Sequence, residues 1–257
     1  MNAMHHLEVS QHPLHSSAAV NGQKLRLLGL HGFRTSGVIL KQQMDFARLT
    51  KRLEDLVDIA YVDAPNQASG PLPEGFKTNI FKGPYYEWWT ARQDSQTQEV
   101  LIYEGWSKTL DFVTQYMADN GPFDGFWAFS QGTILASLLL AMQDQGLILQ
   151  EHPLLKCIVC IGGGRPGASV VEPILTKTLR TPSLHIIGDA DYAKQWSDQL
   201  VNTFVDPVVI RHPKGHIVPA LAGEKLQILR SFLMDCQQER AHQEPTQTLS
   251  EEALALV

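Results

Sequence analysis

Cysteine is scarce in this chain of 257 residues, which has only three cysteines. So small and odd a number excludes a disulfide framework. Cys157 and Cys160 form a C-x-x-C pattern, but they lie in the apolar run LLKCIVCIGG, and no second pair of Cys or His residues stands at ligand spacing. We therefore predict buried structural thiols, no metal site and a reducing compartment, the cytosol with the nucleus as an alternative.

An excess of positive charge and long hydrophobic runs are missing too. The chain has 21 Lys and Arg against 27 Asp and Glu, a formal net charge of −6, and no basic cluster. It therefore lacks the basic surface that binds nucleic acid or anionic lipid. No apolar run approaches the roughly 18 residues of a membrane span, and the N-terminus has no apolar signal-peptide core. We expect no nucleic-acid partner and no membrane partner.

Short apolar runs instead alternate with amphipathic stretches, and 44% of the residues are hydrophobic, enough for one core. The apolar runs predict strands at 25–32, 57–65, 123–130, 155–163, 183–191 and 207–213. Helical spacing of apolar residues predicts helices at 39–56, 104–119, 132–143, 194–203 and 222–235. This alternation predicts an α/β domain whose mostly parallel sheet is covered by helices on both faces.

Three segments depart from the alternation. Residues 1–22 and 238–257 are polar and weakly patterned, so we expect loose tails around a single domain at 23–237. Residues 66–100 combine Pro, Gly and bunched aromatics without periodicity. A stretch of this length predicts a lid-like insertion over a site, with no scaffold element of its own.

Ser130 lies between the apolar run DGFWAF and a helix-like run. In AFSQG, Ala128 and Gly132 place small residues two positions before and two after the serine. This is the G-x-S-x-G pattern of a nucleophile elbow, with alanine in its first small position. The alternative is an ordinary helix N-cap, for which serine is also favoured. Partner residues have to decide between the two.

A nucleophilic serine needs a base, and the base needs a carboxylate that orients it. On an α/β-hydrolase sheet these follow in the order serine, acid, histidine, each after a later strand. Asp189 and Asp191 follow one strand, and His212 and His216 follow the next. We predict His216 as the base because it stands in a Gly-flanked loop, whereas His212 is still at the strand end. The spacing leaves both aspartates open as the acid.

An oxyanion hole requires two backbone amides near the nucleophile. The first predicted strand ends in LHGFR, where Gly32 lets the backbone come close and the Phe33 amide can point into the site. The Gln131 amide, at the start of the helix after Ser130, supplies the second donor. For His31 a loop-shaping role is favoured over a role as base.

These motifs together resemble the FSH family of serine hydrolases. LHGFRTSG, DAP, PYYEWW, GPFDGFWAFSQG, IGGG, PSLHIIGDAD and HPKGHIVP occur in that order, and the resemblance extends over about 24–232. It implies an α/β-hydrolase fold, carboxylesterase or thioesterase activity and no cofactor. Carried over by position, it implies Ser130 as nucleophile, His216 as base and Asp191 as acid. Two departures are Ala128, where the family usually has glycine, and the polar YAKQ after the acid.

We therefore predict a serine hydrolase that cleaves small-molecule carboxylic esters through an acyl-serine intermediate. The alternatives are a thioesterase or acyltransferase for acyl-CoA or carrier-bound acyl groups, and a non-catalytic ligand binder on the same fold. The aromatics of the insertion either form the acyl-pocket wall or pin the insertion to the core, and Arg34 is a candidate partner for an acidic substrate group. The candidate substrate-binding side chains are His31, Arg34, Tyr85, Tyr86 and Trp88.

Overall fold

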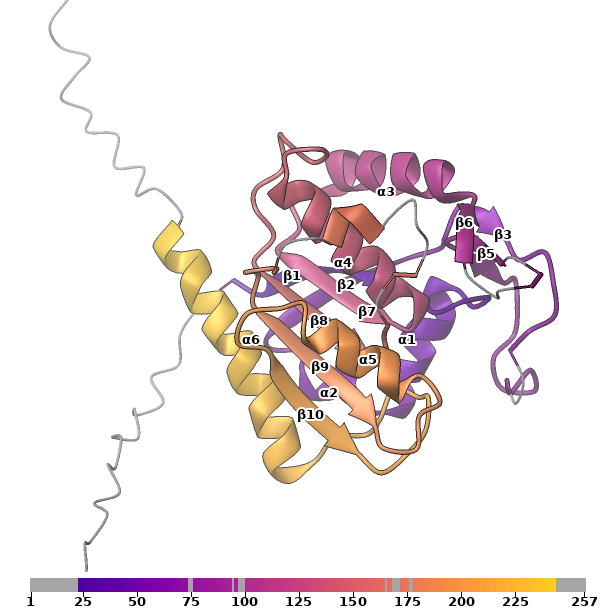
Figure 1. Ribbon diagram of the computed structural model, residues 1–257. Coiled ribbons are helices and arrows are strands. Elements are labelled where there is room, and N and C mark those ends of the chain that lie inside the picture. Colours follow the sequence, from indigo (N-terminus) through magenta and orange to yellow (C-terminus); the bar gives the residue numbers. More distant parts are fainter. Residues whose placement is uncertain are drawn as a thin grey trace, which may run out of the picture.

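The computed structural model describes residues 23–73, 76–93, 95–96, 100–164, 166–167, 172–175 and 178–243. Within them strands and helices alternate and build one layered domain (Figure 1). The predicted tail at 1–22, and the part of the predicted C-terminal tail beyond residue 243, lie outside the described residues.

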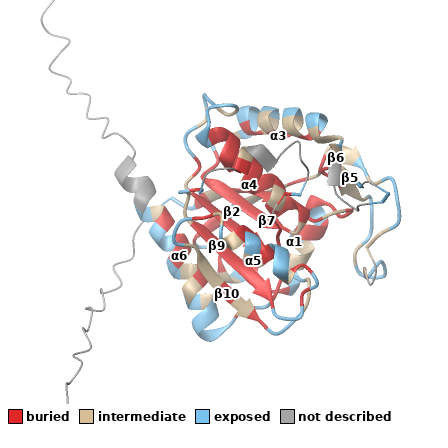
Figure 2. Ribbon diagram, in the orientation of Figure 1, coloured by how far each residue is buried: buried red, intermediate tan, exposed pale blue. Residues whose placement is uncertain are grey.

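The centre of the domain is a parallel sheet of six strands in the order β10-β9-β8-β7-β1-β2. The strands are β1 Leu25–Leu30, β2 Val57–Val62, β7 Gly125–Phe129, β8 Cys157–Ile161, β9 Ser183–Gly188 and β10 Val208–His212. Each lies within a segment predicted as a strand. Every residue of β7, β8 and β9 is buried, as expected for strands covered on both faces (Figure 2).

Helices cover the two faces of the sheet and form two apolar cores. One face is covered by α3 Trp106–Asn120, α4 Gln131–Asp144, the short 3-10 helix η1 Glu172–Leu175 and α5 Lys194–Val201. The other is covered by α1 Gly37–Phe46, α2 Leu49–Arg52 and α6 Gly223–Gln243. Successive side chains of β1 point to opposite faces of the sheet. Leu28 and Leu30 therefore join the first core, and Leu25 and Leu27 join the second. The predicted α/β-hydrolase architecture is confirmed.

Two helices differ from their predicted bounds. The single helix expected over 39–56 is divided, because Arg48 takes a left-handed conformation with φ of 58° between α1 and α2. The last helix was expected to end near residue 235, with a loose tail from 238. It continues to Gln243, since residues 236–243 contain no Gly or Pro to stop it.

The insertion contains short strands where none was predicted. β3 Asn66–Gln67 pairs with β4 Tyr86–Glu87, and β5 Thr90–Gln93 pairs with β6 Val100–Glu104, both antiparallel. They lie to the right of the sheet in Figure 1. Trp88 and Trp89, between the two pairs, are buried in the core. These two tryptophans therefore attach the insertion to the core, which is one of the two roles considered for its aromatic residues.

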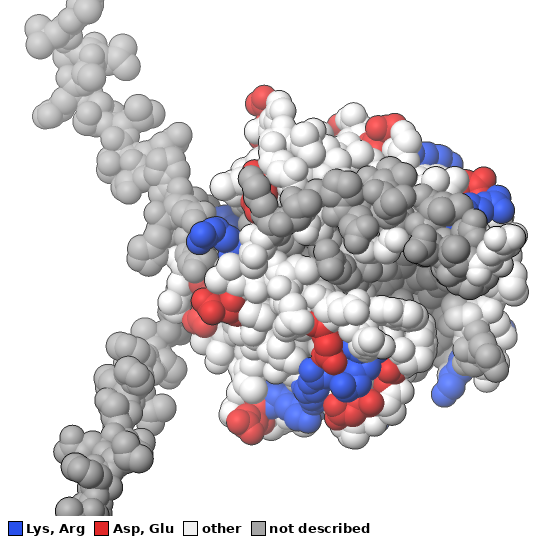
Figure 3. Space-filling model, viewed as in Figure 1, with Lys and Arg blue, Asp and Glu red and all other residues white. Residues whose placement is uncertain are grey.

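Charges of both signs are interspersed on the face in Figure 3. Asp198 of α5, for example, pairs with both Lys194 and Arg211. Among the described residues, no helix combines the length and the apolar character needed to cross a membrane. The described surface seen in this view has no broad field of a single sign.

Candidate active site

Ser130, Asp191 and His216 meet at the carboxyl edge of the sheet, the edge at which ligands of open α/β sheets bind. They follow β7, β9 and β10 respectively. His216 Nε2 lies 2.9 Å from Ser130 Oγ, and His216 Nδ1 lies 2.9 and 3.0 Å from the two carboxylate oxygens of Asp191. The structure thus brings together three side chains that are up to 86 residues apart in sequence.

The backbone holds Ser130 in a strained turn between β7 and α4. Its φ of 54° and ψ of −119° are unusual for a residue with a side chain, and its hydroxyl makes no capping bond to α4. Gly132 is required beside it, because a Cβ there would lie 2.2 Å from the carbonyl oxygen of Leu30. Ala128 is fully buried and fits the first small position. The conformation is that of a nucleophile elbow and not of an N-cap.

The carboxylate of Asp191 fixes the tautomer of His216. A carboxylate can only accept, so Nδ1 carries the proton and Nε2 is left to accept from the Ser130 hydroxyl. The Ala193 amide donates to the same carboxylate at 2.7 Å. Burial raises the pKa of Asp191, but hydrogen bonds from His216 and Ala193 outweigh it, and the pKa lies below its usual value. Asp191 is therefore an anion at neutral pH.

The other two candidates stand outside this arrangement. Asp189 is exposed and does not contact His216 in the described structure. His212 is buried at the end of β10, where its Nδ1 accepts from the Lys214 amide at 3.3 Å, and burial lowers its pKa. The choice of His216 over His212 agrees with the geometry. The sequence spacing allowed either aspartate as the acid, and in the structure it is Asp191 that contacts His216.

Two backbone amides near Ser130 are available to a ligand. Within the described part of the chain, the N–H groups of Phe33 and Gln131 donate no hydrogen bond, whereas the Ser130 amide donates to Ile161. The loop that carries Phe33 passes close to the serine, since a Cβ on Gly32 would lie 3.3 Å from Ser130 Cβ. These are the two amides predicted for an oxyanion hole.

A mostly apolar cavity of about 520 Å³ opens beside Ser130 and His216. Its apolar lining consists of Phe33, Phe46, Pro71, Pro73, Phe76, Ile80, Phe81, Phe129, Ile217 and Val218. Tyr192 and Lys77 also line it. The cavity is large enough for a small molecule with an apolar chain.

None of the five predicted substrate-binding side chains lines this cavity. His31 and Trp88 are both fully buried, and the Trp88 indole N–H donates to the His31 carbonyl, so neither side chain is exposed to a ligand in this structure. Arg34 is held in a buried ion pair with Glu87, so it is not free to meet an acidic substrate group. Tyr85 donates to the Phe81 carbonyl, and Tyr86 packs against the core.

His31 shapes the loop, as favoured from its sequence position. Its Nε2 accepts from the Ala64 amide at 3.0 Å, and its Nδ1 lies 2.8 Å from the Gly32 carbonyl oxygen. An imidazole bonded in this way is neutral, with its proton on Nδ1. Burial lowers its pKa from 6.5 to about 4, although the Gly32 carbonyl and Asp63 oppose this. Both nitrogens of His31 are therefore bonded to backbone groups.

Sequence reasoning missed the side chains that do form the cavity wall. Phe76, Ile80 and Phe81 come from the insertion, and Phe46 comes from the end of α1. In the stretch FKTNIF, Ile80 and Phe81 follow Phe76 by four and five positions, and this helix-like spacing could have identified them.

The side chain of Gln131 was also missed. It bonds the backbone of Trp88 and Trp89.

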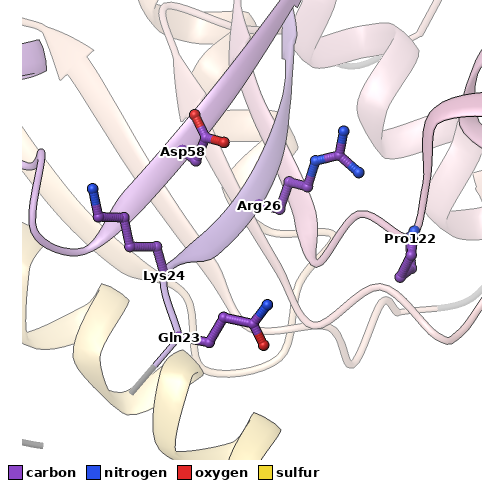
Figure 4. Close-up of a pocket in the computed structure, with 5 residues that line it drawn as sticks. All are labelled: Gln23, Lys24, Arg26, Asp58 and Pro122. Carbon is purple, nitrogen blue, oxygen red and sulfur yellow. The ribbon is translucent and has the colours of Figure 1, made fainter. Parts of the chain in front are cut away.

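A second cavity, of about 600 Å³, lies at the opposite, amino edge of the sheet (Figure 4). Gln23, Lys24, Arg26, Asp58 and Pro122 line it. Its lining contains no serine, threonine, cysteine or histidine. The described residues also contain no group of three or more His, Cys, Asp or Glu that could hold a metal ion. The candidate site is therefore the cavity beside Ser130.

Known proteins resemble this chain in sequence and in fold. A family model described as serine hydrolase (FSH1) matches residues 20–228. Esterase OVCA2 of Homo sapiens is 32% identical over 218 residues, which cover 80% of this chain and 94% of the human protein. Esterase C25G4.2 of Caenorhabditis elegans is 27% identical over 213 residues, with 80% and 91% covered. The crystal structure of Zea mays acyl-protein thioesterase 2 superimposes with a TM-score of 0.55 at 16% identity, covering 86% of this chain and 97% of that one.

Proposed function

The chain belongs to the serine hydrolase (FSH1) family. We propose that it hydrolyses carboxylic esters and that Ser130, Asp191 and His216 are its catalytic residues. One observation carries the proposal. An unbroken series of hydrogen bonds runs from the Asp191 carboxylate through the imidazole to the Ser130 hydroxyl, with 2.9 Å between Nε2 and Oγ. This distance suits direct proton transfer.

Acylation begins when Ser130 Oγ attacks the ester carbonyl carbon and its proton passes to His216 Nε2. The imidazolium that forms is stabilised by the anionic Asp191 on its other nitrogen. The carbonyl oxygen gains negative charge, which the free amides of Phe33 and Gln131 are positioned to bind. His216 then donates the proton to the departing alkoxide, so that an alcohol leaves and an acyl-serine remains.

Deacylation repeats these steps with water. His216 takes a proton from the water molecule as it attacks the acyl-serine, the same two amides bind the oxyanion, and the proton returns to Ser130 Oγ. A carboxylic acid is released. No redox step or external cofactor enters this sequence.

The cavity supports an apolar acyl group as the part of the substrate bound beside Ser130. Its wall is built mainly from phenylalanine, isoleucine, valine and proline side chains. Burying a methylene group contributes about 0.8 kcal/mol, so each carbon that enters should improve binding several-fold. We infer a medium acyl chain from the volume of about 520 Å³.

Thioesters are the second candidate substrate class. The mouth of the cavity is open, with Phe46 67% and Tyr192 72% exposed beside it. A large leaving group, such as the thiol of coenzyme A or of an acyl carrier, would extend into solvent without a clash. The same triad would then act as a thioesterase, or as an acyltransferase if an alcohol replaced water. The name of the maize protein, acyl-protein thioesterase 2, agrees with this alternative.

The test combines covalent labelling with turnover. A fluorophosphonate probe should label the folded protein at Ser130, as located by peptide mass spectrometry. The protein should also hydrolyse p-nitrophenyl esters of increasing chain length, and acyl-CoA assayed in parallel ranks thioesters against esters. Ser130→Ala should abolish both labelling and turnover.

Ser137→Ala is the matched control, because Ser137 lies on α4, the helix that follows Ser130, and is buried, with its hydroxyl bonded to the Ile134 carbonyl. It should keep labelling and turnover near wild type. Folded wild-type protein that neither reacts with the probe nor hydrolyses any ester or thioester would sink the proposal and favour the non-catalytic ligand binder.

A further inference from the structure

A short segment of the insertion, Tyr86 to Trp89, contacts both elements that carry the oxyanion-hole amides. We call residues 86–89 the strap. The Tyr86 amide donates to the Thr35 carbonyl at 2.7 Å, and the Trp88 indole donates to the His31 carbonyl at 2.8 Å. These bonds hold the loop on either side of Phe33.

The strap also holds the other donor of the hole. The Trp88 amide donates to Gln131 Oε1 at 3.1 Å, and Gln131 Nε2 donates to the Trp89 carbonyl at 2.8 Å. Both polar atoms of this side chain are thus bonded to the backbone of neighbouring residues. The residue next to the nucleophile is therefore fixed to the same segment as the Phe33 loop.

Glu87 is the only acidic residue of the strap and is almost completely buried. Its Oε2 accepts from Arg34 Nε at 2.8 Å, and its Oε1 accepts from Thr90 at 2.7 Å and Ser69 at 3.2 Å. Burial raises the pKa of Glu87, but bonds from Arg34, Thr90 and Ser69 outweigh it and keep the pKa below its usual value. The carboxylate is therefore ionised at neutral pH.

Arg34 joins this carboxylate to the hole. It directly follows Phe33, and its guanidinium lies 4.5 Å from the Phe33 ring centroid. Arg34 has a φ of 53°, a left-handed conformation that costs about 1–3 kcal/mol without support. The guanidinium also donates to the Pro71 carbonyl at 2.5 Å. The ion pair and this bond fix the backbone of the residue that follows Phe33, which limits the movement of the loop that carries the Phe33 N–H.

We propose that Glu87, acting through Arg34, is a positioning residue that holds the Phe33 amide in the oxyanion hole. This rests on the proposed function. Glu87 contacts neither the nucleophile nor the cavity, so its effect is expected on the transition state and not on ground-state binding. Loss of a single hole donor costs about 100- to 1,000-fold in kcat, and a misplaced donor should cost less.

Glu87→Gln tests the proposal, because it keeps the shape of the side chain and removes its charge. We expect kcat for a p-nitrophenyl ester to fall about 10- to 100-fold, with KM within about twofold of wild type. A second readout compares an alkyl trifluoromethyl ketone, which forms a tetrahedral adduct with its oxyanion in the hole, with the matching methyl ketone. The preference for the trifluoromethyl compound should shrink by the same factor.

Asp124→Asn is the matched control. Asp124 is also a buried carboxylate in an ion pair, with Lys156, but it precedes β7 at the far edge of the sheet. This variant should melt at a lower temperature, with kcat and the ketone preference unchanged. Equal effects of the two variants, or a change in KM alone for Glu87→Gln, would overturn the positioning role.

Two milder variants cover the case in which Glu87→Gln does not fold. Arg34→Lys keeps the charge but loses the guanidinium fork, and Thr90→Val removes one hydrogen bond to Glu87. We expect a drop of about 3- to 10-fold in kcat at unchanged KM for each. Normal kcat in both folded variants would overturn the proposal while wild-type turnover keeps the proposed function intact. Wild-type protein without turnover or ketone preference would overturn both.

Discussion

The ring of Tyr192 lies 4.7 Å from the imidazole of His216, although Tyr192 is 72% exposed. On another side the Phe129 ring lies 4.9 Å from the same imidazole. An exposed aromatic residue that covers a half-buried imidazole limits the access of water to it. Tyr192 therefore shields the proposed base where the cavity meets solvent.

Replacing Tyr192 by alanine should slow catalysis moderately. An aromatic contact of this kind contributes about 0.5–1.5 kcal/mol, so we expect kcat/KM for apolar esters to fall about 2- to 10-fold. Tyr192→Phe keeps the ring and should behave as wild type in the same assay. If kcat/KM fell as much in Tyr192→Phe as in Tyr192→Ala, the hydroxyl group would be responsible and shielding by the ring would not.

Asp191→Asn should reduce kcat about 10⁴-fold, because an amide can hold the imidazole in the wrong tautomer, as in the corresponding change in chymotrypsin-like proteases. Its neighbour Asp189 supplies the control. Asp189→Asn makes the same chemical change on an exposed side chain and should leave kcat within twofold of wild type. Steady-state hydrolysis of a p-nitrophenyl ester measures both. A reversed order would return Asp189 as the acid.

Ile80 and Ile102 are exposed to similar extents, 42% and 48%, but only Ile80 lines the cavity. Ile80→Ala removes apolar contacts worth about 1 kcal/mol from a long acyl chain. We expect KM to rise about fivefold for long-chain esters, with kcat and short-chain esters unaffected. Ile102→Ala should change neither. Equal KM values for the two variants would place the acyl chain elsewhere.

Gly132→Ala should destabilise the protein and abolish activity. The added Cβ would lie 2.2 Å from a backbone oxygen of β1, which cannot move without disturbing the sheet. Overpacking of this kind costs about 1–3 kcal/mol or more. Gly167→Ala is the comparison, because nothing lies within 4 Å of a Cβ at that position. Thermal melting should separate the two. An unchanged melting temperature in Gly132→Ala would contradict the elbow geometry.

Acid should weaken the fold below about pH 6.5 through two buried histidines. Burial lowers the pKa values of His31 and His185 from 6.5 to about 4. Between these values the unfolded chain binds protons that the folded chain does not, so the free energy of unfolding falls as pH drops from 6.5 towards 4. Each histidine should account for up to about 3 kcal/mol. Urea unfolding at pH 7 and pH 4.5 measures the loss.

His185→Gln should make this pH dependence less steep, since glutamine does not titrate. A variant whose unfolding free energy depends on pH as steeply as that of wild type would mean that His185 is protonated in the folded protein.

Local sequence signals predicted the sheet and the three catalytic candidates. Apolar runs bounded by glycine identify strands buried on both faces, and the small residues around Ser130 identify the elbow. Because the carboxyl ends of parallel strands share one edge, the order serine, acid, histidine predicted that Ser130 and His216 lie together, whereas the choice of Asp191 over Asp189 came from the family resemblance. The cytosolic or nuclear location stays a prediction.

Other features depend on contacts between distant residues and left no local signal. Arg34 and Glu87 are 53 positions apart, and neither position indicates its partner. The strands β3 and β4 have two residues each, too few for an alternating pattern to appear. The left-handed turn at Arg48 falls on a residue that usually favours helix, so the break between α1 and α2 was not foreseen. Tertiary packing overrode local preference at these positions.

The strap and the insertion's part of the acyl-cavity wall, Phe76, Ile80 and Phe81, belong to one continuous stretch of chain, with only four residues between Phe81 and Tyr86. A designer who grafts a relative's whole insertion onto this scaffold would therefore exchange rate and selectivity together. A transplant confined to 76–81 would leave the strap and the Pro71 carbonyl in place, and it is therefore the safer unit for re-shaping the cavity.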